Sequence, residues 1–286
     1  MTNPVTPELL VASPEDLAYA AGLFEGEGCV GRPRGSVSLT INMCDVEPLE
    51  HMWRIVGGTS IRGPYKKPDP THKPYFAWAV NGRVPAQFFY DQTWPWFSLR
   101  RRGQFELAGV SSFDEPVVGV TLAERYAYAA GLYEAEGTLT ADKHSPRVQI
   151  RMGDREPFEW MLAAFGGNIT GPFQPKNPEH KPMWTWYVPG WESFPTVRDA
   201  LGGWLSPRRC AQLDRAIEAS PPLESRGRGT FQRSKTHCPQ GHEYNEENTS
   251  YYANGGRRCL TCHRERENAR YHARQAEKRA AAALAV

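Results

Sequence analysis

The sequence predicts an α+β fold built from two similar halves, followed by a small metal-stabilised module near the C-terminal end. Three observations lead there: a long internal repeat, alternating helix-like and strand-like segments in each copy, and a Cys/His cluster in the last fifth. A chain of 286 residues can bury a sizeable core. We assign residues 10–115 and 116–219 to the two halves, 220–236 to a linker and 237–286 to the module.

The internal repeat keeps an almost constant register. AYAAGLFEGEG at 18–28 returns as AYAAGLYEAEG at 127–137, a shift of 109 residues. GPYKKPDPTHKPYFAWAV at 63–80 returns as GPFQPKNPEHKPMWTWYV at 171–188, and WFSLRR at 96–101 returns as WLSPRR at 204–209, both at a shift of 108. A match this ordered indicates a duplication, which predicts two halves related by an approximate two-fold axis.

Each copy predicts the element order helix, two strands, helix, two strands, helix (αββαββα). Ser13 and Thr121 are typical N-caps, so they should begin the two repeated helices, which end at the following glycines. Asp45 and Asp154 should cap the second helix of each copy. A Pro-rich hairpin with aromatic strands follows, and the repeated Arg pair should precede one closing helix.

Apolar residues alternate with polar ones in the segments after the repeated helices. Val37, Leu39 and Ile41 should point inward in the first copy, as should Val148 and Ile150 in the second. The intervening side chains should therefore form an outward polar face on each sheet.

Small residues line one side of both repeated helices at a spacing of four. Ala18, Gly22 and Gly26 show this spacing in the first helix, and the second copy repeats it. On a single helix this stripe would more simply be part of an ordinary core. Two identical stripes in a duplicated chain instead predict that the two helices pack closely against each other.

Two carboxylates occupy the last turn of these helices, where the helix dipole disfavours an acid. They are Glu27 and Glu136. A divalent cation, most simply Mg²⁺, would compensate two such ends lying side by side, with the backbone carbonyls of Gly26 and Ala135 as further oxygen ligands. Paired hard-metal carboxylates are typical of phosphodiester hydrolysis. Glu25 and Glu134 are expected to be mainly structural.

The charge distribution is uneven along the chain. The net charge is +2, yet residues 220–286 carry 12 Lys and Arg against 7 Asp and Glu, and residues 1–219 carry 22 against 25. This excludes a uniformly basic nucleic-acid binder, so an anionic partner must meet local basic patches. No apolar run approaches the length of a membrane span and no signal-peptide pattern opens the chain, so a soluble cytoplasmic protein is expected.

Four potential metal ligands cluster in the C-terminal module. Cys238 and His242 are separated by three residues, and Cys259 and Cys262 by two. Two such pairs around a hairpin predict a tetrahedral Zn²⁺ site, which would stabilise a segment too short to bury its own core. A redox-active CxxC is the alternative, but the surrounding sequence has no thioredoxin-like pattern.

The motifs AAGLFEGEG and AAGLYEAEG resemble those of the LAGLIDADG homing endonucleases, and the resemblance covers roughly residues 10–218. It implies two αββαββα halves whose antiparallel sheets form a DNA-binding saddle, with the motif helices between them. It also implies that the final acid of each motif, here Glu27 and Glu136, binds the catalytic metal, with Glu replacing Asp. The C-terminal module is similar to small zinc fingers appended to phage and bacterial endonucleases.

The same resemblance places a basic side chain near each scissile phosphate, at the start of the last helix. Arg101 and Arg209 match this position and should stabilise charge there. Met43 and Met152 stand where related proteins often carry a polar residue after the second strand. Water must then be positioned by other groups.

A saddle of this kind predicts the side chains that contact DNA. Base edges should be contacted by Ser36, Ser38, Thr40, Asn42, Arg147, Gln149 and Arg151. Phosphate or base should be contacted by Arg62, Lys66, Lys67, Lys73, Lys176 and Lys181 in the hairpins, and Arg257 and Arg258 in the module. Because the outward residues of the two halves differ, the target should be asymmetric.

The sequence therefore predicts a monomeric, Mg²⁺-dependent, sequence-specific endonuclease that cuts double-stranded DNA at a long site. By resemblance, it would cut across the minor groove, leave short 3′ overhangs, and belong to a mobile genetic element acting near the nucleoid of a bacterial or phage-infected cell. The alternative is a non-cleaving relative, either a DNA-binding regulator or an RNA maturase that helps an intron fold. The intact acid in both motifs favours cleavage, and the two methionines favour the alternative.

Overall fold

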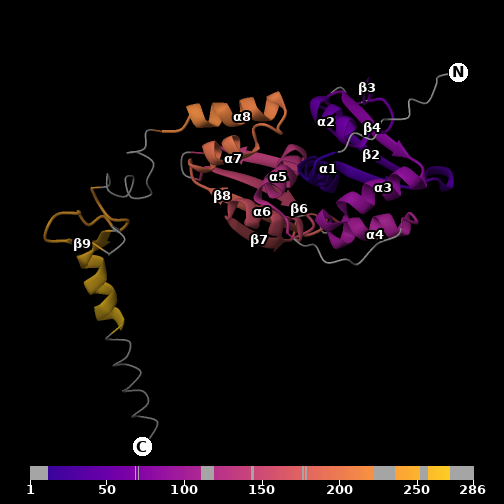
Figure 1. Ribbon diagram of the computed structural model, residues 1–286. Helices are drawn as coiled ribbons and strands as arrows, with labels where there is room; N and C mark the ends of the chain where they lie inside the picture. The colour runs from indigo at the N-terminus through magenta and orange to yellow at the C-terminus, as the bar shows by residue number, and fades with distance from the viewer. Residues whose placement is uncertain are drawn as a thin grey trace, which may run out of the picture. The chain divides into compact units, whose positions relative to one another are not determined.

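The computed structural model describes residues 12–67, 69, 71–110, 119–142, 145–175, 177, 179–221, 236–251 and 257–270. The chain divides into two compact units, Met1–Ser220 and Pro221–Val286. The first unit contains both copies of the repeat, which lie side by side (Figure 1).

The two copies fold into halves with the same order of elements. The first half contains α1 (Pro14–Glu27), β1 (Gly28–Gly31), the 3-10 turn η1 (Pro33–Gly35), β2 (Ser38–Met43), α2 (Glu47–Val56), β3 (Arg62–Tyr65), β4 (Tyr75–Asn81), α3 (Arg83–Thr93), the 3-10 turn η2 (Trp94–Trp96) and α4 (Leu99–Leu107). The second contains α5 (Leu122–Glu136), β5 (Gly137–Thr140), β6 (Arg147–Met152), α6 (Pro157–Phe165), β7 (Asn168–Phe173), β8 (Met183–Pro189), α7 (Ser193–Leu201) and α8 (Pro207–Glu218).

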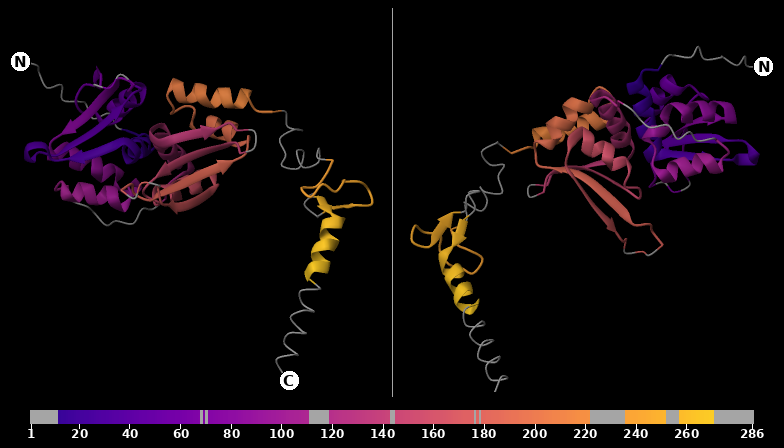
Figure 2. Two further views of the ribbon diagram at one scale, coloured as in Figure 1. Left: turned by 180° about the vertical axis from the view of Figure 1, so that it is seen from behind. Right: turned by 60° about the horizontal axis from the view of Figure 1, so that its bottom comes forward.

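Each half holds one four-stranded antiparallel sheet, with strand orders β1-β2-β4-β3 and β5-β6-β8-β7. The register repeats as well: Ile41 lies opposite Trp78 in the first sheet, and Ile150 lies opposite Trp186 in the second. All four of these side chains are buried, which confirms the inward parity predicted for Ile41 and Ile150. The long hairpin of β7 and β8 projects from the second half (Figure 2).

The motif helices begin as the sequence predicts. Ser13 accepts a hydrogen bond from the Asp16 amide, and Asp16 accepts one from the Ser13 amide, which is a complete capping box. Thr121 accepts a hydrogen bond from the Glu124 amide at the start of α5. Both helices end at the predicted glycine.

Two expectations for the other helices are wrong. Asp45 and Asp154 make no cap, since α2 and α6 begin at Glu47 and Pro157 without a side-chain cap. Instead, both aspartates form ion pairs with arginines of the opposite half. Where one closing helix is predicted, each half has two: α4 and α8 carry the Arg pair, and the additional helices α3 and α7 precede them.

The motif helices α1 and α5 pack directly against each other, as their small-residue stripes predict. A Cβ on Gly22 would overlap the backbone carbonyl of Tyr128, and a Cβ on Gly131 would overlap that of Tyr19. The helices therefore cross where both have glycine, and only glycine permits this approach. The two halves share one hydrophobic core through this contact.

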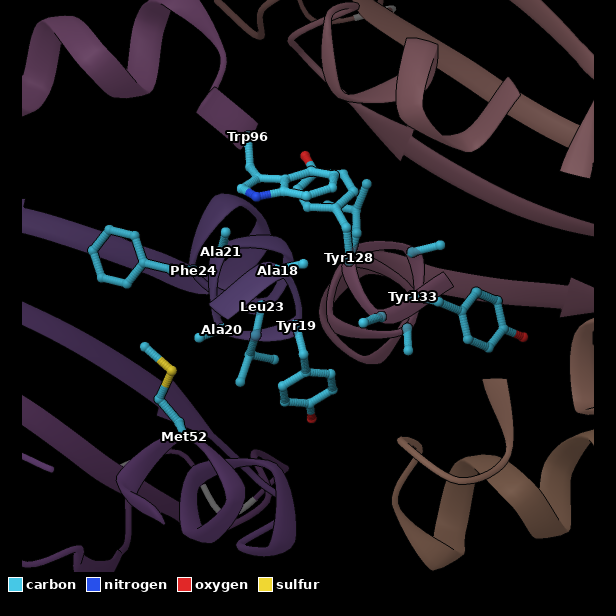
Figure 3. Packing of buried hydrophobic residues seen from close by; sticks show 14 of the residues in the cluster. Ala18, Tyr19, Ala20, Ala21, Leu23, Phe24, Met52, Trp96, Tyr128 and Tyr133 are labelled. Carbon is cyan, nitrogen blue, oxygen red and sulfur yellow. The ribbon is translucent and has the colours of Figure 1, made fainter. Parts of the chain in front are cut away.

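Aromatic side chains extend the junction on both sides of the helix pair. Tyr128 of the second half stacks on Trp96 of the first, with ring centroids 5.0 Å apart (Figure 3). Tyr19 of the first half stacks on Trp204 of the second at 5.6 Å. Figure 3 also shows Phe24 and Tyr133 pointing away from the helix pair, into opposite halves. Each half thus contributes aromatic rings to the packing of the other.

The second unit is small. Strand β9 (Thr249–Tyr251) pairs antiparallel with β10 (Arg257–Cys259), and residues 260–270 form a helix. Across the described residues of both units, every helix is too short or too polar to serve as a membrane span.

Candidate active site

Glu27 and Glu136 are the last residues of the two motif helices, and the helix packing brings them to one place. A Cβ on Gly26 would overlap the Cβ of Ala135 and would lie 3.1 Å from the Cγ of Glu136. The C-terminal turns are therefore in contact beside the two acids. Glu27 is exposed and Glu136 is half-buried, so both are accessible at the junction of the halves.

The environment of these acids disfavours their charge. Desolvation raises the pKa of Glu27 above its usual range, opposed by Arg209. Desolvation also raises the pKa of Glu136, the negative charge of Glu27 raises it further, and Arg209 again opposes. Two helix C-termini add partial negative charge at the same place. A cation would relieve this repulsion.

The donor atoms at the junction fit a hard divalent cation. Carboxylate and carbonyl oxygens are the ligands that Mg²⁺ accepts. At the end of α1, the Phe24 carbonyl accepts the Gly28 amide and the Glu25 carbonyl accepts Arg101. The Gly26 carbonyl is the next one along, beyond the last intrahelical acceptor. Glu27 and Glu136, with the carbonyls of Gly26 and Ala135, could therefore hold such an ion.

Arg101 and Arg209 are buried and bond backbone carbonyls. Their exposed fractions are 2% and 7%. Arg101 donates to the carbonyls of Glu25 (2.8 Å) and Gly28 (2.6 Å), and to the side chain of Gln104 (2.8 Å). Arg209 donates to the carbonyls of Glu134 (2.8 Å) and Gly137 (2.6 Å). Both guanidinium groups are thus bound to backbone carbonyls, and charge stabilisation at the scissile phosphate stays a prediction.

The other two motif acids have the structural role expected of them. Glu25 accepts hydrogen bonds from the amide (3.1 Å) and hydroxyl (2.8 Å) of Ser98, the N-cap of α4. Glu134 accepts the same pair from Ser206, the N-cap of α8, at 3.0 and 2.9 Å. Both carboxylates are fully buried, and burial raises their pKa. Each acid fixes the start of the helix that carries the buried arginine.

Two reciprocal ion pairs between the halves were not predicted from the sequence. Arg100 in α4 contacts Asp154 of the second half at 2.5 Å, and Arg208 in α8 contacts Asp45 of the first half at 2.5 Å. The signal was present, since all four residues recur in the repeat. The pairing could not be predicted because it depends on how the halves meet.

Most of the residues predicted to contact base edges lie on strands β2 and β6. On β2 and β6, Asn42 and Arg151 are exposed, while Thr40 and Gln149 are half-buried. Arg147 is half-buried, with its guanidinium 5.9 Å from the Tyr187 ring centroid. Ser38 departs from the expectation for a base contact: it is 8% exposed and donates to Asn81 at 2.9 Å, because it faces the end of β4.

The other residues predicted to contact DNA differ in whether the structure describes them. The exposed ones are Ser36, Arg62, Lys66, Lys67, Lys73 and Lys181. Lys176 lies outside the described residues. Met43 and Met152 are buried, as their inward parity predicts, so neither position offers a polar atom to the site.

The second unit brings its four predicted ligands together. One donor atom each from Cys238, His242, Cys259 and Cys262 lies within 4.8 Å of the other three. His242 Nδ1 is 3.6 Å from Cys238 Sγ, 3.2 Å from Cys262 Sγ and 3.8 Å from Cys259 Sγ. A tetrahedral ion with bonds of about 2.1–2.3 Å requires ligand separations of about 3.4–3.8 Å, so the cluster could bind zinc.

A fifth residue, missed by sequence reasoning, supports this cluster. The Asn248 side chain donates to the Glu243 carbonyl at 2.6 Å and accepts from the Thr261 amide at 2.9 Å. It therefore joins the segment after His242 to the start of the terminal helix. Arg257 lies on β10, with its guanidinium 4.3 Å from the Tyr244 ring centroid, and both Arg257 and Arg258 are half-buried.

The fold and site together define a duplicated α+β protein with paired acids at the junction of its halves. No protein-family model matches the chain, and a comparison with curated proteins finds no match. Similar solved structures include the LAGLIDADG homing endonuclease I-SmaMI bound to cleaved DNA, at 11% identity and a TM-score of 0.44, with 71% of this chain and 87% of that chain covered. The LAGLIDADG homing endonuclease I-GzeII in complex with its DNA target is 9% identical at a TM-score of 0.44, with 72% of this chain and 89% of that chain covered. The LAGLIDADG meganuclease I-AabMI bound to uncleaved DNA is 12% identical at a TM-score of 0.47, with 79% of this chain and 94% of that chain covered. Similarities at this level show no function of this chain.

Proposed function

We propose that this chain is a sequence-specific, Mg²⁺-dependent double-strand DNA endonuclease of the LAGLIDADG type, acting as a monomer with two pseudo-symmetric halves. One observation carries the proposal: the duplicated helices bring Glu27 and Glu136 together at the junction of two antiparallel sheets. Each half would then supply one acid for one DNA strand.

Glu27 and Glu136, with the carbonyls of Gly26 and Ala135, would hold the metal. When bound, Mg²⁺ polarises the phosphodiester and lowers the pKa of attacking water. Met43 and Met152 are buried and offer no polar atom, so the attacking water would be oriented from the solvent side of the junction. The buried arginines Arg101 and Arg209 bond backbone carbonyls at the ends of the two motif helices.

DNA would lie along the outward faces of the two sheets. Asn42 and Arg151, exposed at matched positions of β2 and β6, would contact base edges in the major groove. Exposed hairpin cations such as Lys66 and Lys181 would contact phosphate. Because Asn42 and Arg151 differ in chemistry, the half-sites would differ too, giving the long asymmetric target that a mobile element in a bacterial or phage-infected cell would carry.

The C-terminal unit would bind a structural Zn²⁺ through Cys238, His242, Cys259 and Cys262, and would act as an additional DNA clamp. The four donor atoms lie within 4.8 Å of one another, and Arg257 and Arg258 lie on the strand that carries Cys259. Zinc would stabilise this small unit, since it has few residues with which to form a core.

The test is incubation of the purified protein with a library of duplex DNA, including the flanks of its own gene, with Mg²⁺ or with EDTA. Discrete cuts that require the metal would support the proposal. Specific binding without cutting, with every divalent metal tried, would instead favour the non-cleaving DNA-binding regulator or the RNA maturase. The buried Met43 and Met152 are the observation that keeps this second candidate open.

A further inference from the structure

Each buried arginine binds the two backbone carbonyls that flank a motif acid. Arg101 bonds the carbonyls of residues 25 and 28, on either side of Glu27. Arg209 bonds those of residues 134 and 137, on either side of Glu136. The paired distances agree between the halves, 2.8 and 2.6 Å in both, so the arrangement is a repeated feature of the fold.

We propose that Arg101 and Arg209 are positioning residues, which fix the turn that presents each metal-binding acid without contacting DNA. This inference rests on the proposed function, because it assigns the two arginines a purpose at that metal site. It replaces the phosphate-contact role that the sequence resemblance implies.

The end of each motif helix explains why an arginine is needed. The chain passes from α1 directly into β1 through Gly28, whose φ of −69° and ψ of 146° are extended. No left-handed residue closes the helix there, so the last carbonyls lack the partners that a standard C-cap would supply. The planar fork of a guanidinium can bond two carbonyls at once, whereas a lysine ammonium acts as a single point.

The arginine and the inner motif acid form a reciprocal pair of caps. The Glu25 side chain caps the start of α4, and the Arg101 side chain, projecting from α4, caps the end of α1. The second half repeats this with Glu134 and Arg209. Since each helix closes an end of the other, the turn carrying Glu27 is fixed by a rigid element and not by a loop.

The proposal is tested with Arg101→Met, Arg209→Met and the control Arg102→Met. Arg102 lies on the same helix and donates to two backbone carbonyls, of Phe97 and Pro95, at 3.1 and 3.3 Å. Arg102→Met therefore also removes a guanidinium that bonds two backbone carbonyls, but it does not alter the contacts of the motif turn. Arg101→Lys provides a second variant, should Arg101→Met fail to fold.

Three quantities are measured on each variant: Mn²⁺ affinity, from the electron paramagnetic resonance signal of free Mn²⁺; duplex DNA affinity across a salt series; and Tm. We expect Arg101→Met and Arg209→Met to weaken Mn²⁺ binding by about 10–100-fold relative to Arg102→Met. The salt dependence of DNA binding should not change, because a buried arginine displaces no counterion. Arg101→Lys should restore part of the Mn²⁺ affinity.

Three results would overturn the proposal. Mn²⁺ affinity equal to that of Arg102→Met, or no Mn²⁺ binding by the unsubstituted protein, would leave the arginines with a purely structural role. A salt slope reduced by about one would instead indicate a phosphate contact. If the protein binds DNA and Mn²⁺ but never cuts, the endonuclease proposal fails, while the Mn²⁺ comparison still decides the role of the arginines.

Discussion

At the residue scale, the two acids of each motif have different roles, one structural and one at the site, although only one residue separates them. Glu25 is fully buried and holds the start of α4, whereas Glu27 is exposed at the junction of the halves. Helix geometry explains the difference, since residues two apart point to different sides of a helix. A structural carboxylate and a site carboxylate therefore coexist in one turn.

Substituting each acid by alanine should separate the two roles. Glu25→Ala would leave the Ser98 amide and hydroxyl without their acceptor and break a buried charge cluster, so we expect a loss of about 3–5 kcal/mol of stability. Glu27→Ala is the matched control: it removes an acid from a helix C-terminus and should leave stability unchanged or slightly higher. Urea denaturation of both variants measures this, and equal losses would contradict it.

The raised pKa of Glu136 predicts that ionised Glu136 lowers the free energy of unfolding of the metal-free protein in a pH-dependent way. The folded pKa lies above the ordinary value of 4.5, so the folded state binds the proton more tightly than the unfolded state does. The contribution of protonated Glu136 to the stability of the folded state is complete below about pH 4.5, and it is lost as the pH rises through the folded pKa. Glu136→Gln should therefore raise Tm at pH 7 in EDTA, and the gain should shrink towards pH 4.

Thermal unfolding from pH 4 to pH 8 checks this directly. Adding Mg²⁺ at pH 7 should stabilise the unsubstituted protein but not Glu136→Gln. A gain in Tm that grows on acidification would contradict the assigned direction of the shift.

At the element scale, the motif helices were predictable because their signals are local. Capping residues, the terminal glycine and the small-residue stripe are all readable in the sequence, and each is confirmed. The caps proposed at Asp45 and Asp154 failed, because these residues bind arginines of the other half. The additional helices α3 and α7 were not predicted, because neither Gly82 nor Glu192 makes the side-chain cap that would mark their starts. A long-range contact decided the first of these errors, and a missing local signal decided the second.

The glycine crossing of α1 and α5 gives a prediction at this scale. Gly22→Ala would force a methyl group into the Tyr128 backbone, so we expect a loss of about 1–3 kcal/mol. Gly103→Ala in α4 is the control: its added Cβ would meet nothing within 4 Å, and helix propensity predicts a small gain, about 0.5–1 kcal/mol. Chemical denaturation measures both, and a tolerated Gly22→Ala would contradict the close packing.

At the scale of the whole molecule, the duplication explains why the site lies between the halves. Neither half alone contains both Glu27 and Glu136, or both sides of the helix crossing. The repeat, the sheets and the position of the acids could be predicted from the sequence. The buried position of Arg101 and Arg209 could not be predicted, because a basic residue at the start of a helix can either face solvent or bond the end of a neighbouring helix.

The C-terminal unit should contribute affinity and not chemistry. Deleting residues 220–286 removes a net charge of +5, so duplex binding should weaken and its salt dependence should flatten. The position of any cut should stay the same, since both acids remain. DNA binding over a salt series and mapping of the cut ends test this, and unchanged affinity would contradict the clamp.

The most direct test of the paired-acid site is cleavage of target DNA by the unsubstituted protein, Glu27→Gln and Glu136→Gln, with DNA binding measured on the same samples. The paired-acid site predicts Mg²⁺-dependent cuts that either substitution abolishes while binding persists. Cuts that survive both substitutions would contradict it, because the acids at the junction of the motif helices would then not be the groups on which cleavage depends.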